Sequence, residues 1–375
     1  MSESNKSIYV TKPSLNNISK IISDLRKINN SRQLTNRGVF HKQFEKDLSL
    51  FLNIPNVSLT CNGTLALLLA IKALDLNGEV ITTPYSFIAT SSVLLWSNIK
   101  PIFIDIDPLT LNIDYKLIEK RITKKTSAIL ITHTYGNPCN FSEIKKIAKK
   151  YGLKIIYDGA AAFGVNDSEG SILRHGDISI TSFHATKVLT TIEGGAIFTK
   201  NKLLKKKIDL MINFGFKNEF EISELGLNLK MNEFQAICGI HNLHNYRKDL
   251  NKREKINNYY RKRLGNLKGI RLFNHQAGSS SNYSYFPIIN TNNKIDSIKF
   301  LYDELKNKEI HARRYFYPII PEYSIFKKIA NKKIDYPVAN QISKNILCLP
   351  IYKDLNLKDV DRICNSVIEI VKKRY

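Results

Sequence analysis

The sequence predicts an α/β protein with a mostly parallel central sheet flanked by helices, followed by a smaller α+β C-terminal domain. Between residues 57 and 200, short apolar runs alternate with helix-length stretches, a pattern typical of parallel strands joined by helical crossovers. After residue 200, helical patterns precede a smaller mixed region. We therefore predict a large domain over 1–245 and a small domain over 246–375, with the N-terminal segment packing near the small domain.

Each element of this prediction rests on a short stretch. The strands of the large domain are "VSLT" (57–60), "EVITT" (79–83), "PIFIDI" (101–106), "SAILIT" (127–132), "LKIIYD" (153–158) and "ISITSF" (178–183). Helices are expected at "GTLALLLAIKAL", at "SFIATSSVLLWS" and over 231–264, and small-domain strands at "SYFPII" and near "NILCLP". Ligands gather at the carboxyl ends of parallel strands. The residues that follow each strand are therefore the first candidates for a site.

Composition excludes several classes of protein. The chain of 375 residues carries a net charge of +24, but its basic residues are spread along its whole length. We therefore expect no nucleic-acid partner, only a general attraction for anions. No apolar run approaches the roughly 18 residues of a membrane span, and the polar N-terminus lacks the apolar centre of a signal peptide. Five scattered cysteines without metal-ligand spacing indicate reduced thiols in the cytoplasm and no metal site.

The first chemical feature is "TCNGTLAL", where a strand ends at Thr60 and a helix opens at Gly63 and Thr64. Glycine permits an unusual turn, and the threonine hydroxyl lies beside the free N–H groups of the first helical turn. This combination is suited to binding a phosphate. The alternative is a helix cap without a ligand.

Two further features follow later strands. Asp158 ends the strand "KIIYD" and precedes the small residues "GAAAFG". It is either a cap for the next turn or a carboxylate that faces a cation. Lys187 follows the strand that ends near Ser182, in a stretch with no other charge until Glu193. It is either a surface lysine or an amine whose desolvation makes it a nucleophile for carbonyls. A phosphate site, an anion for a ring nitrogen and an amine for an aldehyde together predict pyridoxal 5'-phosphate.

These motifs resemble the DegT/DnrJ/EryC1/StrS family of nucleotide-sugar aminotransferases, which have the aspartate-aminotransferase fold (fold type I of the pyridoxal-phosphate enzymes). The resemblance covers about residues 33 to 350. Its matching stretches, in order, are "LTNRGVFHKQFEKDL", "NGTLAL", "EVITTPYSFIAT", "PIFIDIDPLTLNID", "THTYGNP", "YDGAAAFG", "SFHATKVLTTIEGGAI", "GLNLKMNEFQA" and "RRYFYP".

The resemblance implies roles for the cofactor-binding positions. Lys187 would be the catalytic residue, bonding to the cofactor aldehyde and acting as a general base. Asp158 would pair with the protonated ring nitrogen. Thr64 and Ser182 would hold the phosphate, helped by the Leu65 backbone N–H.

Other matching positions imply stacking and a partner subunit. Phe87 matches the aromatic residue that stacks on the cofactor ring. Asn228 matches the residue that reaches the phosphate from the partner subunit, which implies a homodimer with shared active sites. Ala161 departs from the family, which usually has Gln or His there to bind the cofactor's phenolic oxygen. Leu65 also replaces the commoner Ala or Thr.

The resemblance also implies the reaction. Family members that dehydrate sugars carry His at the position of Lys187, so transamination from L-glutamate to a nucleotide-linked keto-sugar is expected. "SFHATK" and "RRYFYP" resemble the branch acting at C-4 of dTDP-4-keto-6-deoxyglucose, in the biosynthesis of surface polysaccharides. The expected substrate-binding residues are Thr35, Asn36, Gly38, Tyr85, Lys230, Arg313, Arg314, Tyr315 and Tyr317. The alternatives are a 3-aminotransferase, an aminotransferase for UDP-sugars or cyclitols, and a non-catalytic regulatory relative.

Overall fold

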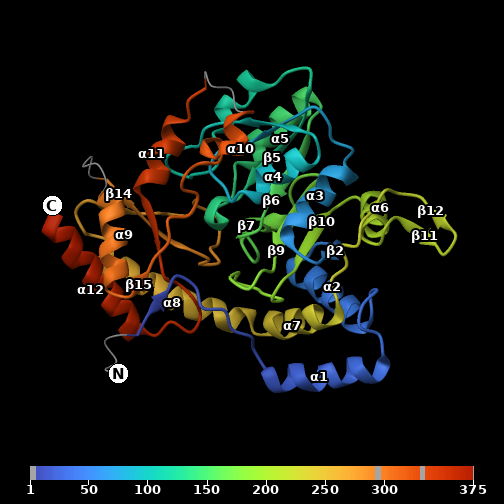
Figure 1. The fold of residues 1–375 in the computed structure, drawn as a ribbon, viewed down its shortest axis with the longest axis horizontal. Helices are drawn as coiled ribbons and strands as arrows, with labels where there is room; N and C mark the ends of the chain where they lie inside the picture. The colour runs from blue at the N-terminus through green and yellow to red at the C-terminus, as the bar shows by residue number, and fades with distance from the viewer. Residues whose placement is uncertain (1–5, 292–296, 330–333, 375) are drawn as a thin grey trace.

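The large domain is built on a seven-stranded sheet. The computed structural model describes residues 6–291, 297–329 and 334–374. Within them the strand order is β2-β10-β9-β6-β5-β3-β4 (Figure 1). The bounds are β2 (Asn56–Thr60), β3 (Glu79–Thr82), β4 (Lys100–Phe103), β5 (Thr126–Thr132), β6 (Lys154–Asp158), β9 (Ile178–Ser182) and β10 (Gly195–Thr199). Only β10 pairs antiparallel with its neighbours. The predicted mostly parallel sheet is therefore confirmed.

Helices cover both faces of this sheet. Apolar side chains of α3 (Gly63–Ala73), α4 (Ala89–Trp96) and α6 (Lys202–Ile212) share one buried cluster with the sheet. On the other face, α5 (Phe141–Tyr151) shares a second cluster. Ile, Leu, Val and Ala side chains of the central strands contribute to both clusters, so these strands are buried on both faces, as expected for a parallel sheet.

A long helical region links the two parts of the chain. α7 (Glu233–His244) packs against α2 (Val39–Leu52) and α1 (Ile18–Ser31). After Asn245, α8 (Tyr246–Leu264) continues into the core of the C-terminal part. Figure 1 shows α7 and α8 running below the sheet, with α1 beneath them. The predicted division near 245 falls at this junction. Whether the two parts are separate domains stays a prediction.

The C-terminal part is a small antiparallel sheet covered by helices. Its strands are β13 (Ile270–Leu272), β14 (Phe286–Asn290) and β16 (Ile346–Leu349), paired in that order. Its helices, besides α8, are α9 (Ser297–Asn307), α10 (Ser324–Lys327), α11 (Pro337–Asn345) and α12 (Leu357–Arg374). The N-terminal strand β1 (Ile8–Tyr9) pairs with β15 (Ile310–His311) of this part. Both ends of the described chain therefore lie on the same side in Figure 1.

Two short hairpins complete the fold. β7 (Asn166–Asp167) pairs with β8 (Gly170–Ser171), and β11 (Phe216–Asn218) pairs with β12 (Glu221–Ile222). Figure 1 shows β11 and β12 extending away from the sheet beyond α6. None of the described helices is long and apolar enough to cross a membrane.

Candidate active site

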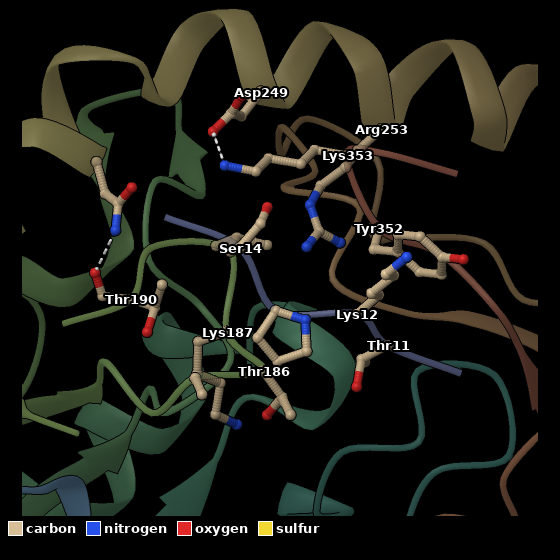
Figure 2. A pocket seen from close by; sticks show the side chains of 14 residues that line it. Thr11, Lys12, Ser14, Thr186, Lys187, Thr190, Asp249, Arg253, Tyr352 and Lys353 are labelled. Atoms are coloured by element: carbon tan, nitrogen blue, oxygen red, sulfur yellow. Dashed lines mark hydrogen bonds and ion pairs between the residues drawn. The ribbon is translucent and has the colours of Figure 1, made fainter. Parts of the chain in front are cut away.

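Lys187 lies on the loop after β9, at the wall of a pocket. Figure 2 shows the opposite wall formed by Asp249 and Arg253 of α8. Lys353, from the segment before α12, binds Asp249 at 3.2 Å, and the N-terminal segment 11–14 passes between these walls. The pocket therefore joins four parts of the chain that are distant in sequence.

The electrostatics of Lys187 and Asp158 depend on burial. Desolvation lowers the pKa of the Lys187 amine, while the charge of Asp158 opposes that shift. Asp158 is 4% exposed, and desolvation raises the pKa of its carboxyl group against the hydrogen bonds it accepts. An amine with a lowered pKa is a stronger candidate for a nucleophile and base than an ordinary lysine.

A set of buried hydroxyl groups holds the Asp158 carboxylate. Thr90 Oγ1 donates to Asp158 Oδ2 at 2.7 Å, and the Ala160 N–H donates to Oδ1 at 3.0 Å. Behind Thr90, Ser86 Oγ lies 2.7 Å from Thr90 Oγ1 and 2.8 Å from Thr132 Oγ1. The carboxylate is thus held at the carboxyl edge of the sheet, where β5 and β6 both end. Sequence reasoning missed these residues, although Ser86 and Thr90 stand four positions apart in the motif "SFIAT".

The N-terminus of α3 offers a phosphate site. Thr64 is exposed, and the first N–H groups of a helix have no partner within it. Gly63 is needed here because a Cβ at this position would lie 2.8 Å from the Cβ of Ser182. This close approach brings Ser182 to the helix start; its predicted role in binding the phosphate stays a prediction. The Leu65 N–H, expected to help hold the phosphate, instead donates to Asn62 Oδ1 at 2.8 Å.

Two predicted aromatic residues differ in exposure. Phe87 is 60% exposed and is free to stack on a ligand. Tyr85 is completely buried, and its hydroxyl lies 2.7 Å from that of Tyr135. Tyr85 also packs edge-on against Phe316. In this arrangement Tyr85 supports the wall of the site and does not present its own side chain to a substrate, which differs from the expectation.

The predicted segment 313–317 carries two arginine–aromatic pairs. The Arg313 guanidinium lies 4.9 Å from the Tyr315 ring, and the Arg314 guanidinium lies 3.7 Å from the Tyr317 ring. Tyr285 connects this segment to the base of the site: burial raises the pKa of its hydroxyl, and both Arg313 and Asp158 act on it electrostatically. Arg313 and Tyr317 are exposed, as a role at the entrance requires.

The predicted sugar-binding residues in the loop before α2 differ in exposure. Thr35 and Asn36 are exposed, so both side chains are available to a ligand. Gly38 is buried against the carboxylate of Glu233, so it shapes the loop and does not itself offer a contact. This corrects the expectation for Gly38.

Asn228 and Lys230 lie beside the β11–β12 hairpin. Asn228 is exposed, and its backbone forms an isolated bridge with Asn213. The Lys230 amine donates to Asn213 Oδ1 at 2.7 Å and lies 4.9 Å from the Phe214 ring. Burial lowers the pKa of Lys230.

Ala161 has no polar side-chain atom, and its surroundings are already paired. Asn282 Nδ2 and Ser284 Oγ donate to the Ala161 carbonyl oxygen at 2.8 and 3.1 Å. Ser284 Oγ also lies 2.5 Å from Asn282 Oδ1. These two residues of the C-terminal part therefore fix the backbone that follows Asp158.

The residues present fit pyridoxal phosphate. The start of α3 and Ser182 suit its phosphate, the buried Asp158 carboxylate suits its ring nitrogen, and Lys187 supplies the amine for its aldehyde. Among the described residues, no group of three or more His, Cys, Asp or Glu side chains is placed to hold a metal ion.

Comparison with known proteins identifies the family. The model of the DegT/DnrJ/EryC1/StrS aminotransferase family matches residues 16–368. The chain belongs to this family. It is similar to the dTDP-4-amino-4,6-dideoxy-D-glucose transaminase of Shigella dysenteriae, with 44% identity over 97% of this chain and 99% of that protein. The Escherichia coli protein of the same name is 42% identical over 97% and 98%.

Solved structures agree with this assignment. The aminotransferase is similar to DesI, solved in the presence of its TDP-sugar product, with a TM-score of 0.92, 27% identity and coverage of 97% of this chain and 93% of DesI. The predicted fold type, aminotransferase activity and pyridoxal-phosphate dependence are confirmed. The roles of individual site residues stay predictions.

Proposed function

We propose that this aminotransferase moves the amino group of L-glutamate to C-4 of dTDP-4-keto-6-deoxy-D-glucose, giving dTDP-4-amino-4,6-dideoxyglucose. The observation that carries this proposal is that the Lys187 amine and the Asp158 carboxylate, at the carboxyl edge of the sheet, are close enough to act on each other electrostatically. The substrate is supported by the two relatives named for this sugar, which match the chain over nearly its full length.

Different residues of the chain would bind the cofactor and move the proton. Pyridoxal phosphate, when bound, supplies the electron sink that makes the Cα–H of an amino acid acidic. Thr64 and Ser182 would bind its phosphate, and Asp158, held by Thr90, would keep the ring nitrogen protonated. The Lys187 amine would move the proton between the reacting carbons as a general base, for which its lowered pKa suits it.

At the substrate side, the exposed residues are the strongest candidates. Thr35, Asn36, Arg313 and Tyr317 are all exposed. A guanidinium group binds phosphate oxygens through charge-assisted, often bidentate hydrogen bonds. We therefore assign Arg313 to the diphosphate of the nucleotide-sugar and the loop before α2 to the sugar. Arg314, Tyr315 and the buried Tyr85 would support these contacts.

A homodimer is part of the proposal. Asn228 is exposed on the segment that follows the β11–β12 hairpin, and Phe220 in the hairpin turn and Leu225 after β12 are 93% and 90% exposed. Large exposed apolar side chains that cluster on a surface are typical of protein interfaces. Asn228 would reach the partner's phosphate site from this interface. The cytoplasmic location also stays a prediction, supported by five cysteines that are all free.

The experiment is a substrate panel. The purified enzyme is incubated with L-glutamate and with dTDP-linked and UDP-linked 4-keto and 3-keto sugars, and products are analysed by mass and NMR. The proposal predicts the highest kcat/KM with dTDP-4-keto-6-deoxyglucose and nitrogen at C-4. Nitrogen at C-3, or reaction only with a UDP-linked sugar, would contradict it.

A further inference from the structure

The loop that precedes α2 is held by a carboxylate from another helix. α2 begins after Gly38 and has no side-chain cap of its own. Instead Glu233, in the first turn of α7, accepts hydrogen bonds from the N–H groups of Phe40 at 2.8 Å and His41 at 3.0 Å. A capping side chain normally satisfies these second and third N–H groups of a helix. Glu233 is 2% exposed, so its carboxylate is committed to this contact.

The same carboxylate explains the glycine at position 38. Gly38 has φ −67° and ψ −165°, a backbone conformation that any residue can adopt. A Cβ at this position, however, would lie 2.6 Å from Glu233 Cδ and 2.8 and 2.9 Å from its two oxygens. The glycine is therefore required by the close approach of Glu233 and not by the backbone conformation.

Contacts also hold the residues on each side of Thr35 and Asn36, namely Leu34 and Arg37. The Glu233 N–H donates to the Leu34 carbonyl at 3.0 Å. Arg37 is paired with Glu45 at 3.1 Å and with Asp209 at 2.9 Å. Asn36 and Arg37 adopt left-handed conformations, with φ of 61° and 59°. Asn tolerates this conformation, whereas for Arg37 it is unfavourable and persists because the surroundings impose it.

The first turn of α7 also contacts the loop that carries the catalytic lysine. Gln235 Nε2 donates to the Glu193 carbonyl at 2.7 Å, in the turn that follows Lys187. Gln235 is itself fixed by a reciprocal pair of hydrogen bonds with Asn232. One helical turn therefore sets the position of the loop before α2 relative to the lysine loop.

We infer that Glu233 is a positioning residue for the keto-sugar: its carboxylate sets the shape of the 34–38 loop, so that Thr35 and Asn36 meet the sugar. This inference rests on the proposed role of that loop in binding the sugar. It assigns Glu233 no contact with substrate or cofactor. It predicts that the loop can be disturbed without disturbing the chemistry at Lys187.

The first test replaces the carboxylate by its amide. In Glu233→Gln one oxygen can still accept an N–H, but the amide NH₂ group faces the other N–H. We expect the KM for the nucleotide keto-sugar to rise by up to about tenfold, because the loop loses a hydrogen bond to a charged group and a smaller fraction of molecules then has the loop shape that binds the sugar. The half-reaction with glutamate, followed by absorbance in the absence of sugar, should keep its rate. An equal loss of rate in the half-reaction with glutamate and in the half-reaction with the keto-sugar would overturn the inference.

The second test uses Gly38, and it remains informative if Glu233→Gln folds poorly. Gly38→Ala should raise the keto-sugar KM in the wild-type background. In the Glu233→Ala background the same substitution should have no further effect, because the carboxylate that the new methyl group meets is gone. Independent effects of the two substitutions would show that they do not act through one contact, and would contradict the inference.

A matched control separates positioning from general stability. Asp105 caps α11 in the same way, accepting from the N–H groups of Val338 and Ala339 at 2.9 and 2.8 Å. Asp105→Asn should lower the melting temperature. It should leave the ratio of the KM for the keto-sugar to the KM for L-glutamate unchanged. If Asp105→Asn raises the keto-sugar KM as Glu233→Gln does, the effect is general and the inference fails.

Variants of Thr35 and Asn36 distinguish a failure of the proposed sugar-binding loop from a failure of the inference about Glu233. If Thr35→Ala and Asn36→Ala leave the keto-sugar KM unchanged, the loop does not bind the sugar, and both the proposed role and the inference fall. If they raise it while Glu233→Gln does not, only the inference falls. A rise in the keto-sugar KM in all three variants supports both the role of the loop and the inference about Glu233.

Discussion

At the residue scale, the amine of Lys187 lies where desolvation makes its protonated form unfavourable. Burial lowers the pKa of Lys187 from its ordinary value of 10.5. A group whose pKa is lower in the folded than in the unfolded chain binds its proton more tightly when unfolded, so its protonated form destabilises the fold. The penalty is present at neutral pH and disappears as the pH rises above 10.5.

We therefore predict that Lys187 lowers the stability of the fold and is retained for function. Lys187→Met keeps most of the side-chain volume and removes the charge. In cofactor-free protein we expect the variant to have a higher free energy of unfolding than wild type at pH 7, measured by urea denaturation. The difference should shrink as the pH approaches and passes 10.5. A difference that does not change with pH would show that desolvation of the charge is not its cause.

The hydroxyl groups behind Asp158 lead to a second prediction. The hydrogen bond from Thr90 favours the ionised carboxylate, and Thr90→Val removes it with little change in volume. We expect the pKa of Asp158 to rise further and the rate of transamination to fall about tenfold, since hydrogen bonds to charged groups contribute roughly 1.5–3 kcal/mol. Thr199→Val is the control, because Thr199 is also buried but donates to the Asp177 carbonyl. Equal losses in the two variants would contradict the role of Thr90.

At the element scale, the strands were predictable because each is a short apolar run with a helical crossover. β10 was not among the predicted strands: only 12 residues, 183–194, separate it from β9, and no helix lies between them. A connection without a crossover helix favours antiparallel pairing, which is what the structure shows. The short β13 was missed for a similar reason, because its three residues carry no pattern of their own.

The β11–β12 hairpin is the element on which the proposed dimer depends. If Asn228 acts across this interface, a Lys187→Ala chain and an Asn228→Ala chain are each defective in every site of their own dimers. A mixed dimer contains one site with both residues intact. We therefore expect about a quarter of wild-type activity to return in an equal mixture after subunits exchange: half of the dimers are then mixed, and half of their sites intact.

Two controls make this experiment decisive. Subunit exchange is followed with two differently tagged chains, so that lack of mixing cannot be mistaken for lack of complementation. Phe220→Ser with Leu225→Ser, which removes two exposed apolar side chains of the hairpin region, should shift the protein towards monomer in sedimentation. Mixed dimers no more active than their parents would contradict the shared site.

At the scale of the whole molecule, sequence reasoning found the residues that follow strands and missed those brought in from elsewhere. Asp158 and Ser182 lie at strand ends, so parallel topology alone placed them together. Arg253 of α8 and Lys353 line the pocket beside Lys187 through contacts between parts of the chain distant in sequence, which local patterns do not encode. Glu233 was missed for the same reason.

The central claim is that Lys187 is the amine of a pyridoxal-phosphate site. Its most direct test is reduction of the purified enzyme with borohydride in the presence of the cofactor, followed by peptide mass mapping. We predict that the reduced cofactor is attached to the peptide that contains Lys187 and that this label is lost in Lys187→Ala. Label on a different lysine, or unchanged labelling in the variant, would contradict the account.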